Sequence, residues 1–420
     1  MKNNISIPQP LPRIARFEEL GFGLFLHFGL YSLLGKGEWI QDFEKIPVQE
    51  YERLAERFTV EKFDARAMAR LCRDAGMRYA CLTTRHHDGF SLYDTRGLSA
   101  FDAPRSAAGR DLVAEFVEGC RAEGIVPFLY HTTLDWRWDS KHCSEERFAE
   151  YLDYLNASVE ILCTQYGEIG GLWFDGNWSR PGADWKEDRL YATIRKHQPE
   201  AIIINNTGLD ARGALGHPEL DCLTFEQGLP GSPDRSGWPK YLAGESCETL
   251  NAHWGVGARD FLFKSPATVI ERLCACRKVG ANYLINVGPQ ADGSLGGYEV
   301  ELLKIVGRWI HEVGGSIYAG KPVPAQCGGQ DFLLETEGWL YYFAHALNVQ
   351  GDKHVVPGGG NGPRSISGLN RKLAGARWLD NDAKIPFIEN HDGSVTVLDC
   401  HGYDYGTNLV VRVAELSVAV

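Results

Sequence analysis

The stretch that decides the fold is residues 171–178, Gly-Leu-Trp-Phe-Asp-Gly-Asn-Trp. An apolar run from Ile169 ends abruptly at the acid Asp175, and an apolar run bounded by glycines predicts a buried strand. A carboxylate at the tip of such a strand, between two tryptophans, is placed as a glycoside-cleaving nucleophile would be. The alternative is a strand-end aspartate that only caps a turn or a helix.

Seven further apolar segments resemble this strand, and amphipathic segments lie between them. The eight predicted strands cover residues 21–29, 79–85, 125–132, 169–176, 201–206, 221–227, 244–250 and 282–289. The predicted helices cover residues 64–75, 109–123, 144–165, 185–197, 266–279 and 295–313. Strand and helix alternation with near-continuous apolar strands predicts an α/β fold, a (β/α)8-like barrel of the TIM type over residues 1–320. Distortion is expected from the fifth to the seventh strand, where the linking segments are rich in Gly and Pro and lack clear helices.

The sequence pattern changes after Tyr318. Short alternating segments, broken by Gly, Asn and Asp, occupy residues 331–335, 340–345, 376–379, 394–398 and 408–413, and residues 357–364 form a long loop. This pattern predicts a small C-terminal antiparallel β-sandwich over residues 321–420.

Composition limits the partners and the compartment. The chain of 420 residues has a formal net charge of -12, which disfavours nucleic acid or an anionic membrane as its main partner. There is no apolar run of about 18 residues, so no membrane span is expected. The eleven cysteines form no CxxC pair, which is typical of free thiols in a reducing compartment. The N-terminus lacks the apolar core of a secretory signal, so a cytoplasmic location is expected.

Function in a parallel barrel gathers at the carboxyl ends of the strands. Polar side chains recur at all eight predicted ends or in the loops that follow them. They are His27 with Glu38 and Trp39, then His86, His87 and Asp88, Tyr130, Asp175, Asn205 and Asn206, Glu226, Glu245 followed by Trp254, and Asn286. A single polar strand end means little, but folding alone does not explain eight of them.

Two chemistries fit this set of residues. A metal hydrolase would use His86 and His87 next to Asp88, with His27 and Asp175, as ligands. Against this, adjacent histidines on an extended chain point to opposite faces, and the chain has no HxH or HExxH motif. A glycosidase would use two carboxylates, with the histidines binding hydroxyl groups. The fourth and sixth strand ends place Asp175 and Glu226 where they can converge across the barrel mouth. We therefore expect neither a metal nor a cofactor.

The chain resembles the α-L-fucosidases of glycoside hydrolase family 29 over residues 16–318. The motifs that carry the resemblance are GLFLHFGLYS (23–32), GEW (37–39), AGMRYACLTTRHHDGFSLYDT (75–95), GRDLV (109–113), LWFDGNW (172–178), ETLNAHWGV (248–256) and NYLINVGPQADGSL (282–295). The resemblance implies a retaining exo-α-L-fucosidase that removes terminal fucosyl residues from glycans or glycoconjugates by double displacement.

The resemblance also implies roles for individual residues. Asp175 takes the nucleophile's place. His27, Glu38, Trp39, His86, His87 and Tyr130 match positions that bind the hydroxyls and ring of fucose, and Phe25, Trp173 and Trp254 match positions that pack its methyl group. The acid/base is Glu226 as first choice, with Glu245 as the alternative.

The sequence leaves two other interpretations of the function open. One is another retaining glycosidase, acting on a galactoside or a different deoxy-sugar, and another is a fucose-binding relative without catalysis. The expected partner is a fucosylated oligosaccharide or glycoconjugate, and homo-oligomerisation is left open.

Overall fold

The computed structural model describes residues 7–207, 209, 211–231, 233, 238–356 and 362–419. The predicted loop at 357–364 thus lies largely outside the described residues. The chain forms two compact units, described separately below. The first comprises Met1–Lys264 and Ala281–Lys304, and the second comprises Ser265–Gly280 and Ile305–Val420. The boundary between residues 320 and 321 stays a prediction.

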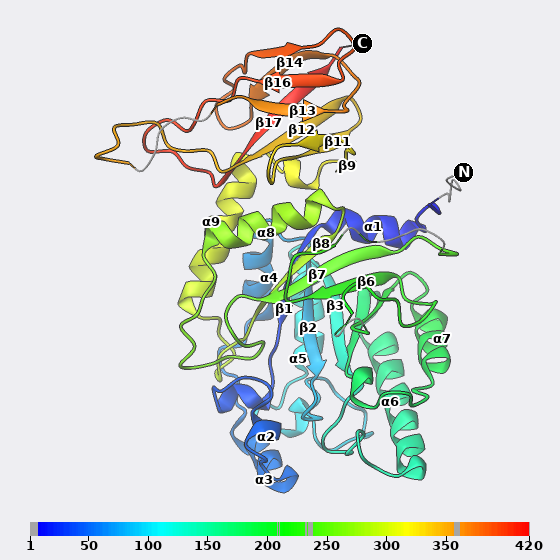
Figure 1. The fold of residues 1–420 in the computed structure, drawn as a ribbon. Helices are drawn as coiled ribbons and strands as arrows, with labels where there is room; N and C mark the ends of the chain where they lie inside the picture. The colour runs from blue at the N-terminus through cyan, green and yellow to red at the C-terminus, as the bar shows by residue number, and fades with distance from the viewer. Residues whose placement is uncertain are drawn as a thin grey trace. The chain divides into compact units, whose positions relative to one another are not determined.

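The first unit is built on one parallel eight-stranded sheet that curls into a nearly closed barrel (Figure 1). Its strands are β1 (Phe22–Leu26), β2 (Tyr79–Arg85), β3 (Val126–Thr132), β4 (Gly171–Asp175), β5 (Ile202–Asn205), β6 (Cys222–Glu226), β7 (Ala243–Thr249) and β8 (Asn282–Val287). The hydrogen-bonded order is β5-β4-β3-β2-β1-β8-β7-β6. All eight predicted strands are present, and the predicted fold class is confirmed.

The barrel is distorted between β5 and β6, which share no continuous ladder. Asp221 bridges this gap: its backbone amide donates to the Ile203 carbonyl at 2.9 Å, and its carboxylate accepts the Ile203 amide at 3.1 Å. Among the described residues, no helix separates β5 from β6 or β6 from β7. The Gly- and Pro-rich links of the sequence correctly indicated this region.

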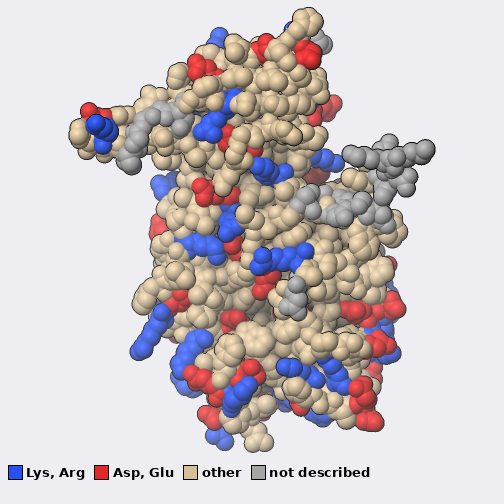
Figure 2. Space-filling model, in the orientation of Figure 1, with Lys and Arg blue, Asp and Glu red and all other residues tan. Residues whose placement is uncertain are grey.

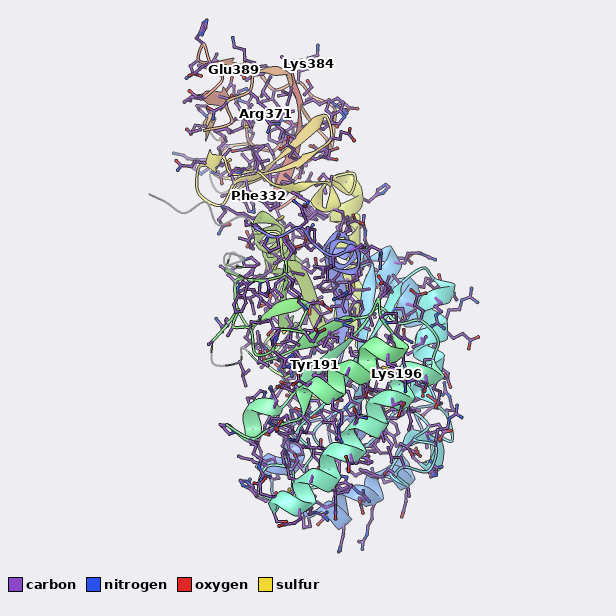
Figure 3. All side chains as sticks on the ribbon, turned by 90° about the vertical axis from the view of Figure 1, so that its right-hand side faces the viewer. Tyr191, Lys196, Phe332, Arg371, Lys384 and Glu389 are labelled. Carbon is purple, nitrogen blue, oxygen red and sulfur yellow. The ribbon has the colours of Figure 1, made fainter. Side chains whose placement is uncertain are left out.

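The described residues form nine α-helices, of which the last six begin and end close to the predicted limits and the first three were not predicted. They are α1 (Pro12–Leu20), α2 (Ile40–Phe43), α3 (Val48–Glu52), α4 (Ala65–Asp74), α5 (Leu112–Ala122), α6 (Glu145–Gln165), α7 (Glu187–His197), α8 (Pro266–Lys278) and α9 (Gly297–Glu312). The side chains of Asp64, Asp111 and Ser144 accept backbone amides at the starts of α4, α5 and α6, as helix N-caps do. Helix α7 is amphipathic: Tyr191 is fully buried, whereas Lys196 is 71% exposed (Figure 3).

Large side chains fill the barrel interior below its mouth. Tyr79, Phe128 and Trp173 from successive strands pack in one buried cluster with Ile14 and Phe17 of α1. Helix α1, which the sequence pattern did not predict, thus supplies apolar side chains to the barrel core. A β-carbon at Gly23 would lie 2.5 Å from the Tyr79 ring, so this glycine makes room for the tyrosine.

The second unit contains two antiparallel sheets, as predicted for a sandwich. One has the order β10-β13-β16-β15 and the other β14-β17-β12-β11-β9. The strands are β9 (Lys321–Pro322), β10 (Gln326–Cys327), β11 (Phe332–Thr336), β12 (Trp339–His345), β13 (Arg364–Ser367), β14 (Leu373–Trp378), β15 (Phe387–Glu389), β16 (Val395–Leu398) and β17 (Val411–Val418). Their shared core includes Leu340, Ile366, Leu398 and Leu416 from both sheets. The shorter strands β9, β10, β13 and β15 were not predicted.

The distribution of charged side chains and the state of the cysteines can both be compared with what the composition predicted. Figure 2 shows basic and acidic side chains interspersed over the visible face, without a large area of one sign. All eleven cysteines are free thiols. Among the described helices, none combines the length and the apolar character that a membrane crossing requires.

Candidate active site

A cavity of about 120 Å³ opens at the carboxyl ends of the barrel strands. Most of the predicted site residues line it. The lining comprises Phe25, His27, Trp39, His86, His87, Tyr130, Trp173, Asp175, Trp178, Asn206, Leu209, Glu226 and Trp254. Residues as far apart in the chain as Phe25 and Trp254 meet here because parallel strands end at one rim of the barrel.

Asp175 is the last residue of β4, and its side chain is 15% exposed. Because side chains alternate along a strand, Trp173 and Asp175 share the inner face, and Asp175 pairs in register with Thr132 of β3. Its Oδ1 accepts the Trp178 indole N–H at 2.9 Å, and its Oδ2 accepts the Tyr130 hydroxyl at 3.3 Å. These donors orient the carboxylate toward the cavity.

Glu226 ends β6 on the other side of the cavity. Burial, followed by the charge of Asp175, raises the pKa of Glu226 to about 7, although a hydrogen bond from Asn206 opposes the shift. The Thr224 hydroxyl donates to Asn206 Oδ1 at 3.0 Å, so the amide group of Asn206 turns its N–H bonds toward the carboxylates. Glu226 can therefore hold a proton near neutral pH.

The contacts of Asn206 Nδ2 set an upper limit on the distance between the Asp175 and Glu226 carboxylates. Asn206 Nδ2 is 2.6 Å from Glu226 Oε2 and 3.4 Å from Asp175 Oδ1. Glu226 Oε2 and Asp175 Oδ1 therefore cannot be farther apart than the sum of these two distances. That limit is below about 6.5 Å, where the separations of inverting glycosidases begin, and it includes the roughly 5–5.5 Å of retaining ones.

His27 follows β1 and is held in one tautomer. The Asn286 amide nitrogen donates to the Trp254 carbonyl at 2.6 Å, so Asn286 Oδ1, 2.6 Å from His27 Nδ1, must accept. His27 therefore carries its proton on Nδ1, and burial lowers its pKa to about 3. The neutral ring leaves Nε2 as an acceptor for a donor hydroxyl.

His87 is fixed in the same way by a different chain of hydrogen bonds. The Thr132 hydroxyl donates to the Leu134 carbonyl at 2.5 Å, so it accepts from His87 Nδ1 at 2.6 Å. Burial lowers the pKa of His87 to about 4, and its Nε2 lies 3.5 Å from Asp175 Oδ2. Two acceptors thus lie close together, and a substrate hydroxyl can donate its single proton to one of them.

His86 also lines the cavity, which corrects one sequence inference. Both histidines come after the end of β2 at Arg85, in a loop, and their ring centroids lie 4.1 Å apart. The alternation of an extended strand therefore does not separate them. His86 Nδ1 is buried without a hydrogen-bond partner, and burial holds the pKa of His86 well below its ordinary value.

The apolar wall is formed by aromatic rings. Phe25 packs edge-on against Trp173 at 5.3 Å and against Trp254 at 5.9 Å between centroids. Tyr130 stacks on Trp173 at 5.7 Å. These rings form an apolar corner of the cavity, and the packing of a methyl group against Phe25, Trp173 and Trp254 stays a prediction of the resemblance.

Two predicted site residues do not line the cavity. Glu245, the alternative acid/base, lies fully buried within β7, where its oxygens accept the Tyr79 hydroxyl at 2.6 Å and the Trp173 indole N–H at 2.8 Å. Glu38 accepts the Gly255 amide at 2.8 Å. Both carboxylates thus stabilise the aromatic wall without lining the cavity. Glu245 accepts a hydrogen bond from Trp173, and Glu38 accepts one from the loop that carries Trp254.

Sequence reasoning did not assign roles to three lining residues, Trp178, Asn206 and Leu209. Trp178 is the last residue of the motif at 171–178, and Asn206 directly follows β5. The sequence therefore placed both residues near the carboxyl end of a strand. Their contacts with Asp175 depend on the tertiary fold. Among the described residues, no group of three or more His, Cys, Asp or Glu side chains is placed to hold a metal ion.

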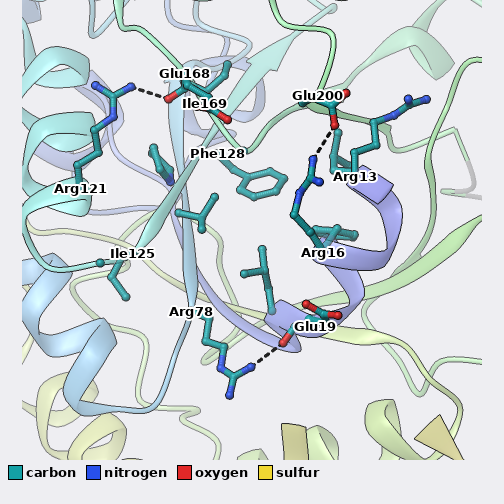
Figure 4. Close-up of a pocket in the computed structure, with 17 residues that line it drawn as sticks. Arg13, Arg16, Glu19, Arg78, Arg121, Ile125, Phe128, Glu168, Ile169 and Glu200 are labelled. Atoms are coloured by element: carbon teal, nitrogen blue, oxygen red, sulfur yellow. Dashed lines mark hydrogen bonds and ion pairs between the residues drawn. The ribbon is translucent and has the colours of Figure 1, made fainter. Parts of the chain in front are cut away.

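A larger cavity, about 570 Å³, lies at the opposite, amino-terminal ends of the strands (Figure 4). Its arginines already have partners: Arg16 pairs with Glu200 at 2.6 Å, Arg78 donates to the Glu19 carbonyl at 2.8 Å, and Arg121 donates to the Glu168 carbonyl at 2.5 Å. It brings together no pair of a nucleophile and an acid. The smaller cavity is therefore the stronger candidate for the active site.

A carboxylate pair at the carboxyl ends of a (β/α)8-like barrel, walled by tryptophans, defines a glycoside hydrolase. The family model described as "Alpha-L-fucosidase" matches residues 4–315, and the chain belongs to that family. The tissue alpha-L-fucosidase of Bos taurus is 27% identical over 364 residues, covering 80% of this chain and 74% of the relative.

Solved structures give the same result. Alpha-L-fucosidase isoenzyme 1 from Paenibacillus thiaminolyticus superposes with a TM-score of 0.82 at 31% identity, covering 97% of this chain and 99% of the other. The Thermotoga maritima alpha-fucosidase, at 23% identity and a TM-score of 0.75, covers 97% of each chain and shares the fold. This protein is therefore a glycoside hydrolase of the α-L-fucosidase family.

Proposed function

We propose that this chain is a retaining exo-α-L-fucosidase in which Asp175 is the nucleophile and Glu226 the acid/base. The observation that carries the proposal is the Asn206 amide that both carboxylates approach, since it keeps two of their oxygens closer together than the separations of inverting glycosidases and is compatible with the retaining separation. The small volume of the cavity, about 120 Å³, and its aromatic side chains support exo action on a single terminal sugar.

In the first step, Asp175 Oδ2 attacks the anomeric carbon while the bond from that carbon to the leaving oxygen breaks. Glu226 gives its proton to the departing oxygen, and a fucosyl ester forms on Asp175. In the second step, Glu226 takes a proton from water as the water oxygen attacks the anomeric carbon and the ester bond breaks. The product keeps the α configuration. Oδ1 is held by the Trp178 indole N–H at 2.9 Å, whereas both contacts of Oδ2, with Tyr130 and His87, are 3.3 Å or longer, so Oδ2 is the better placed oxygen.

Recognition follows from the state of the histidines. His27 and His87 each present a neutral Nε2 that accepts a hydroxyl proton. The wall of Phe25, Trp173 and Trp254 faces a carbon without a hydroxyl. A galactoside hydroxyl buried there would lack a partner, at a cost of about 1–3 kcal/mol. We therefore infer a preference for fucosides over galactosides and a fucosylated oligosaccharide or glycoconjugate as substrate.

The nucleophile is tested with Asp175→Gly and an aryl α-L-fucoside. We expect turnover to fall by on the order of 10⁴ or more, because the covalent route is lost. Added azide should restore part of the rate by attacking the vacated face and giving an inverted fucosyl azide. A variant that keeps more than about a tenth of the wild-type rate would falsify the assignment.

The acid/base is tested by comparing Glu226→Ala with Glu245→Gln. The Glu226 variant should spare substrates with good leaving groups, lose those with poor ones by about 10²–10⁴, and respond to azide. Glu245→Gln should weaken the hold on Trp173 and affect both kinds of leaving group alike. The reverse pattern would make Glu245 the acid/base and overturn our choice.

The cellular setting is also proposed. Eleven free thiols support a reducing compartment, and the net charge of -12 argues against nucleic acid and anionic membranes as partners. Fractionation of the producing cells, followed by activity measurement in each fraction, tests the cytoplasmic location.

A further inference from the structure

A second cavity adjoins the sugar-binding cavity and shares two of its tryptophans. It has a volume of about 450 Å³, and both Trp39 and Trp178 line it as well as the smaller cavity. Its other walls come from the segment after β3, which carries Trp136, and from α2 and the residues that follow it. We call this cavity the tryptophan groove. It offers far more room than the cavity that holds the nucleophile.

Trp39 and Trp178 form the boundary between the two cavities, and Trp136 joins them on the side of the groove. Trp39 lies nearly parallel to Trp178, with centroids 6.2 Å apart and an angle of 21°, and Trp136 meets Trp39 edge-on at 5.3 Å. Trp178 donates its indole N–H to Asp175, so one end of this cluster is fixed at the reaction centre. Flat, rigid aromatic faces bind the C–H faces of pyranose rings at a low entropy cost.

Two residues of the groove carry buried polar atoms that have no partner. Gln41 Oε1 and Ser179 Oγ are both buried, in side chains that belong to residues only 4% and 7% exposed, and both residues line the groove. Leaving such a group unsatisfied costs about 1–3 kcal/mol. The two atoms expose almost no surface, so a rotation of each side chain toward the groove is needed before hydroxyl groups of a bound ligand supply the missing hydrogen bonds. This observation is independent of the aromatic cluster.

The charges along the groove cancel. Lys45 Nζ donates to Asp42 Oδ1 at 3.2 Å, and the acid Asp139 is offset by the base Lys141. The third acid of the lining, Asp135, is buried with Arg85 Nε 3.8 Å from its Oδ2. A groove without net sign, lined by indoles and by amide and hydroxyl oxygens, fits a neutral polyhydroxylated ligand better than an anionic one.

We propose that the tryptophan groove binds the neutral sugar units of the aglycone, so that the enzyme prefers fucosylated oligosaccharides over short fucosides. This inference rests on the proposed function, because the groove is useful only if Asp175 acts on a terminal fucosyl group. Contacts remote from the reacting bond raise kcat/KM when they are made in the transition state. Trp136 and Ser179 are then specificity residues of the aglycone side.

The test compares three substrates: an aryl α-L-fucoside, a fucosylated disaccharide and a neutral fucosylated tetrasaccharide or longer glycan of the same linkage. In the wild-type enzyme, kcat/KM should be at least about ten-fold higher for the long glycan than for the disaccharide, equivalent to about 1.4 kcal/mol. Trp136→Ala should lower the ratio of kcat/KM for the long glycan to that for the aryl fucoside by about ten-fold. Ser179→Ala should lower the same ratio by a smaller factor.

The control is Trp339→Ala, an equal truncation of a tryptophan that is 42% exposed on β12 in the second unit; this variant should keep the wild-type ratio. Equal wild-type values for the disaccharide and the long glycan would overturn the inference, as would a Trp136→Ala loss that is the same for all three substrates. Absence of any wild-type turnover of the aryl fucoside would instead reject the proposed function. A sialylated glycan cleaved as well as its neutral counterpart would contradict the preference for a neutral aglycone.

Discussion

At the scale of single residues, the site depends on amide and hydroxyl groups that carry no charge. Asn286 and Thr132 fix the tautomers of His27 and His87, and Asn206 lies between Asp175 and Glu226, the two carboxylates proposed as catalytic. Each of these groups is oriented by a second hydrogen bond to a carbonyl or a hydroxyl. The chemistry of the charged residues is thus set by neutral neighbours that hold one orientation.

The pH dependence of activity tests Glu226 and Asn206 together. Glu226 must be protonated in the first step, so kcat/KM should fall as pH rises through about 7, the pKa of Glu226. The Asn206 amide stabilises the ionised form, so Asn206→Ala should raise that pKa and move the alkaline limb of kcat/KM to higher pH. We also expect a rate loss of about ten-fold or more, because the carboxylate is no longer positioned.

The matched control for this change is the neighbouring asparagine. Asn205 points away from the cavity and donates to the Tyr191 hydroxyl at 2.9 Å. Asn205→Ala should therefore leave the alkaline limb where it is. A limb that shifts equally in both variants, or in neither, would argue against the role given to Asn206.

At the scale of elements, the geometry of the site depends on the ends of the barrel strands and on the turns that follow them. The turn after β4 shows this, because Gly176 adopts φ 108° and a β-carbon there would lie 2.5 Å from the Leu134 backbone nitrogen. This close approach lets the segment after β3 pass directly beside Asp175, whose carbonyl accepts the Thr133 amide at 2.7 Å. A glycine is required here by both conformation and space.

Gly176→Ala should therefore reduce both stability and activity. The positive φ costs about 1 kcal/mol, and the contact with Leu134 forces the strand end to move, which should lower kcat/KM by about ten-fold or more. Gly182→Ala is the control, because Gly182 also has a positive φ of 77° but has nothing within 4 Å of the added β-carbon. Urea unfolding and kcat/KM measured on both variants separate conformation from contact. Equal activity losses would show that the contact with Leu134 is unimportant.

At the scale of the whole barrel, closure between β5 and β6 relies on one buried carboxylate in place of a ladder. Asp221 is fully buried and accepts bonds from Arg13 at 3.0 Å, Arg195 at 2.5 Å and Lys240 at 3.3 Å. These groups come from α1, α7 and the segment before β7. The carboxylate thereby ties together elements on both sides of the gap.

Asp221→Asn should destabilise the fold by about 3 kcal/mol, the low end for a broken buried pair, because its three cationic partners keep part of their hydration. Burial alone would raise the pKa of Asp221, but the hydrogen bond from Arg13 and the charges of Arg195 and Lys240 lower it overall. A lowered pKa contributes stability that is present above the ordinary value of about 3.9 and is lost as pH falls. The variant should therefore lose less stability on acidification than the wild type.

Guanidinium unfolding at pH 7 and at about pH 3 measures this difference. Glu200→Gln serves as the control, since its partner Arg16 and Glu200 itself are both more than half exposed and such pairs contribute little. If Glu200→Gln proved as damaging as Asp221→Asn, closure by the buried carboxylate would be excluded.

The sequence by itself determined the local parts of this protein. Periodicity located the eight strands, the main helices and the change to antiparallel sheets. The motif at 171–178 placed an acid at a strand end. Alternation along β4 then put Trp173 and Asp175 on one face, since side-chain direction in a strand is a local property. Short strands such as β9 and β15 were missed because two or three residues carry no periodic signal.

Only the tertiary structure decided how those parts meet. It placed Glu226 at the cavity and Glu245 behind Trp173, although both are glutamates near barrel strand ends. It also brought His86 and His87 to one cavity, and it set Asn206 between the two carboxylates. The physical reason is that distances across a barrel mouth depend on strand register and closure. These arise from the packing of segments far apart in the chain, which no local pattern encodes.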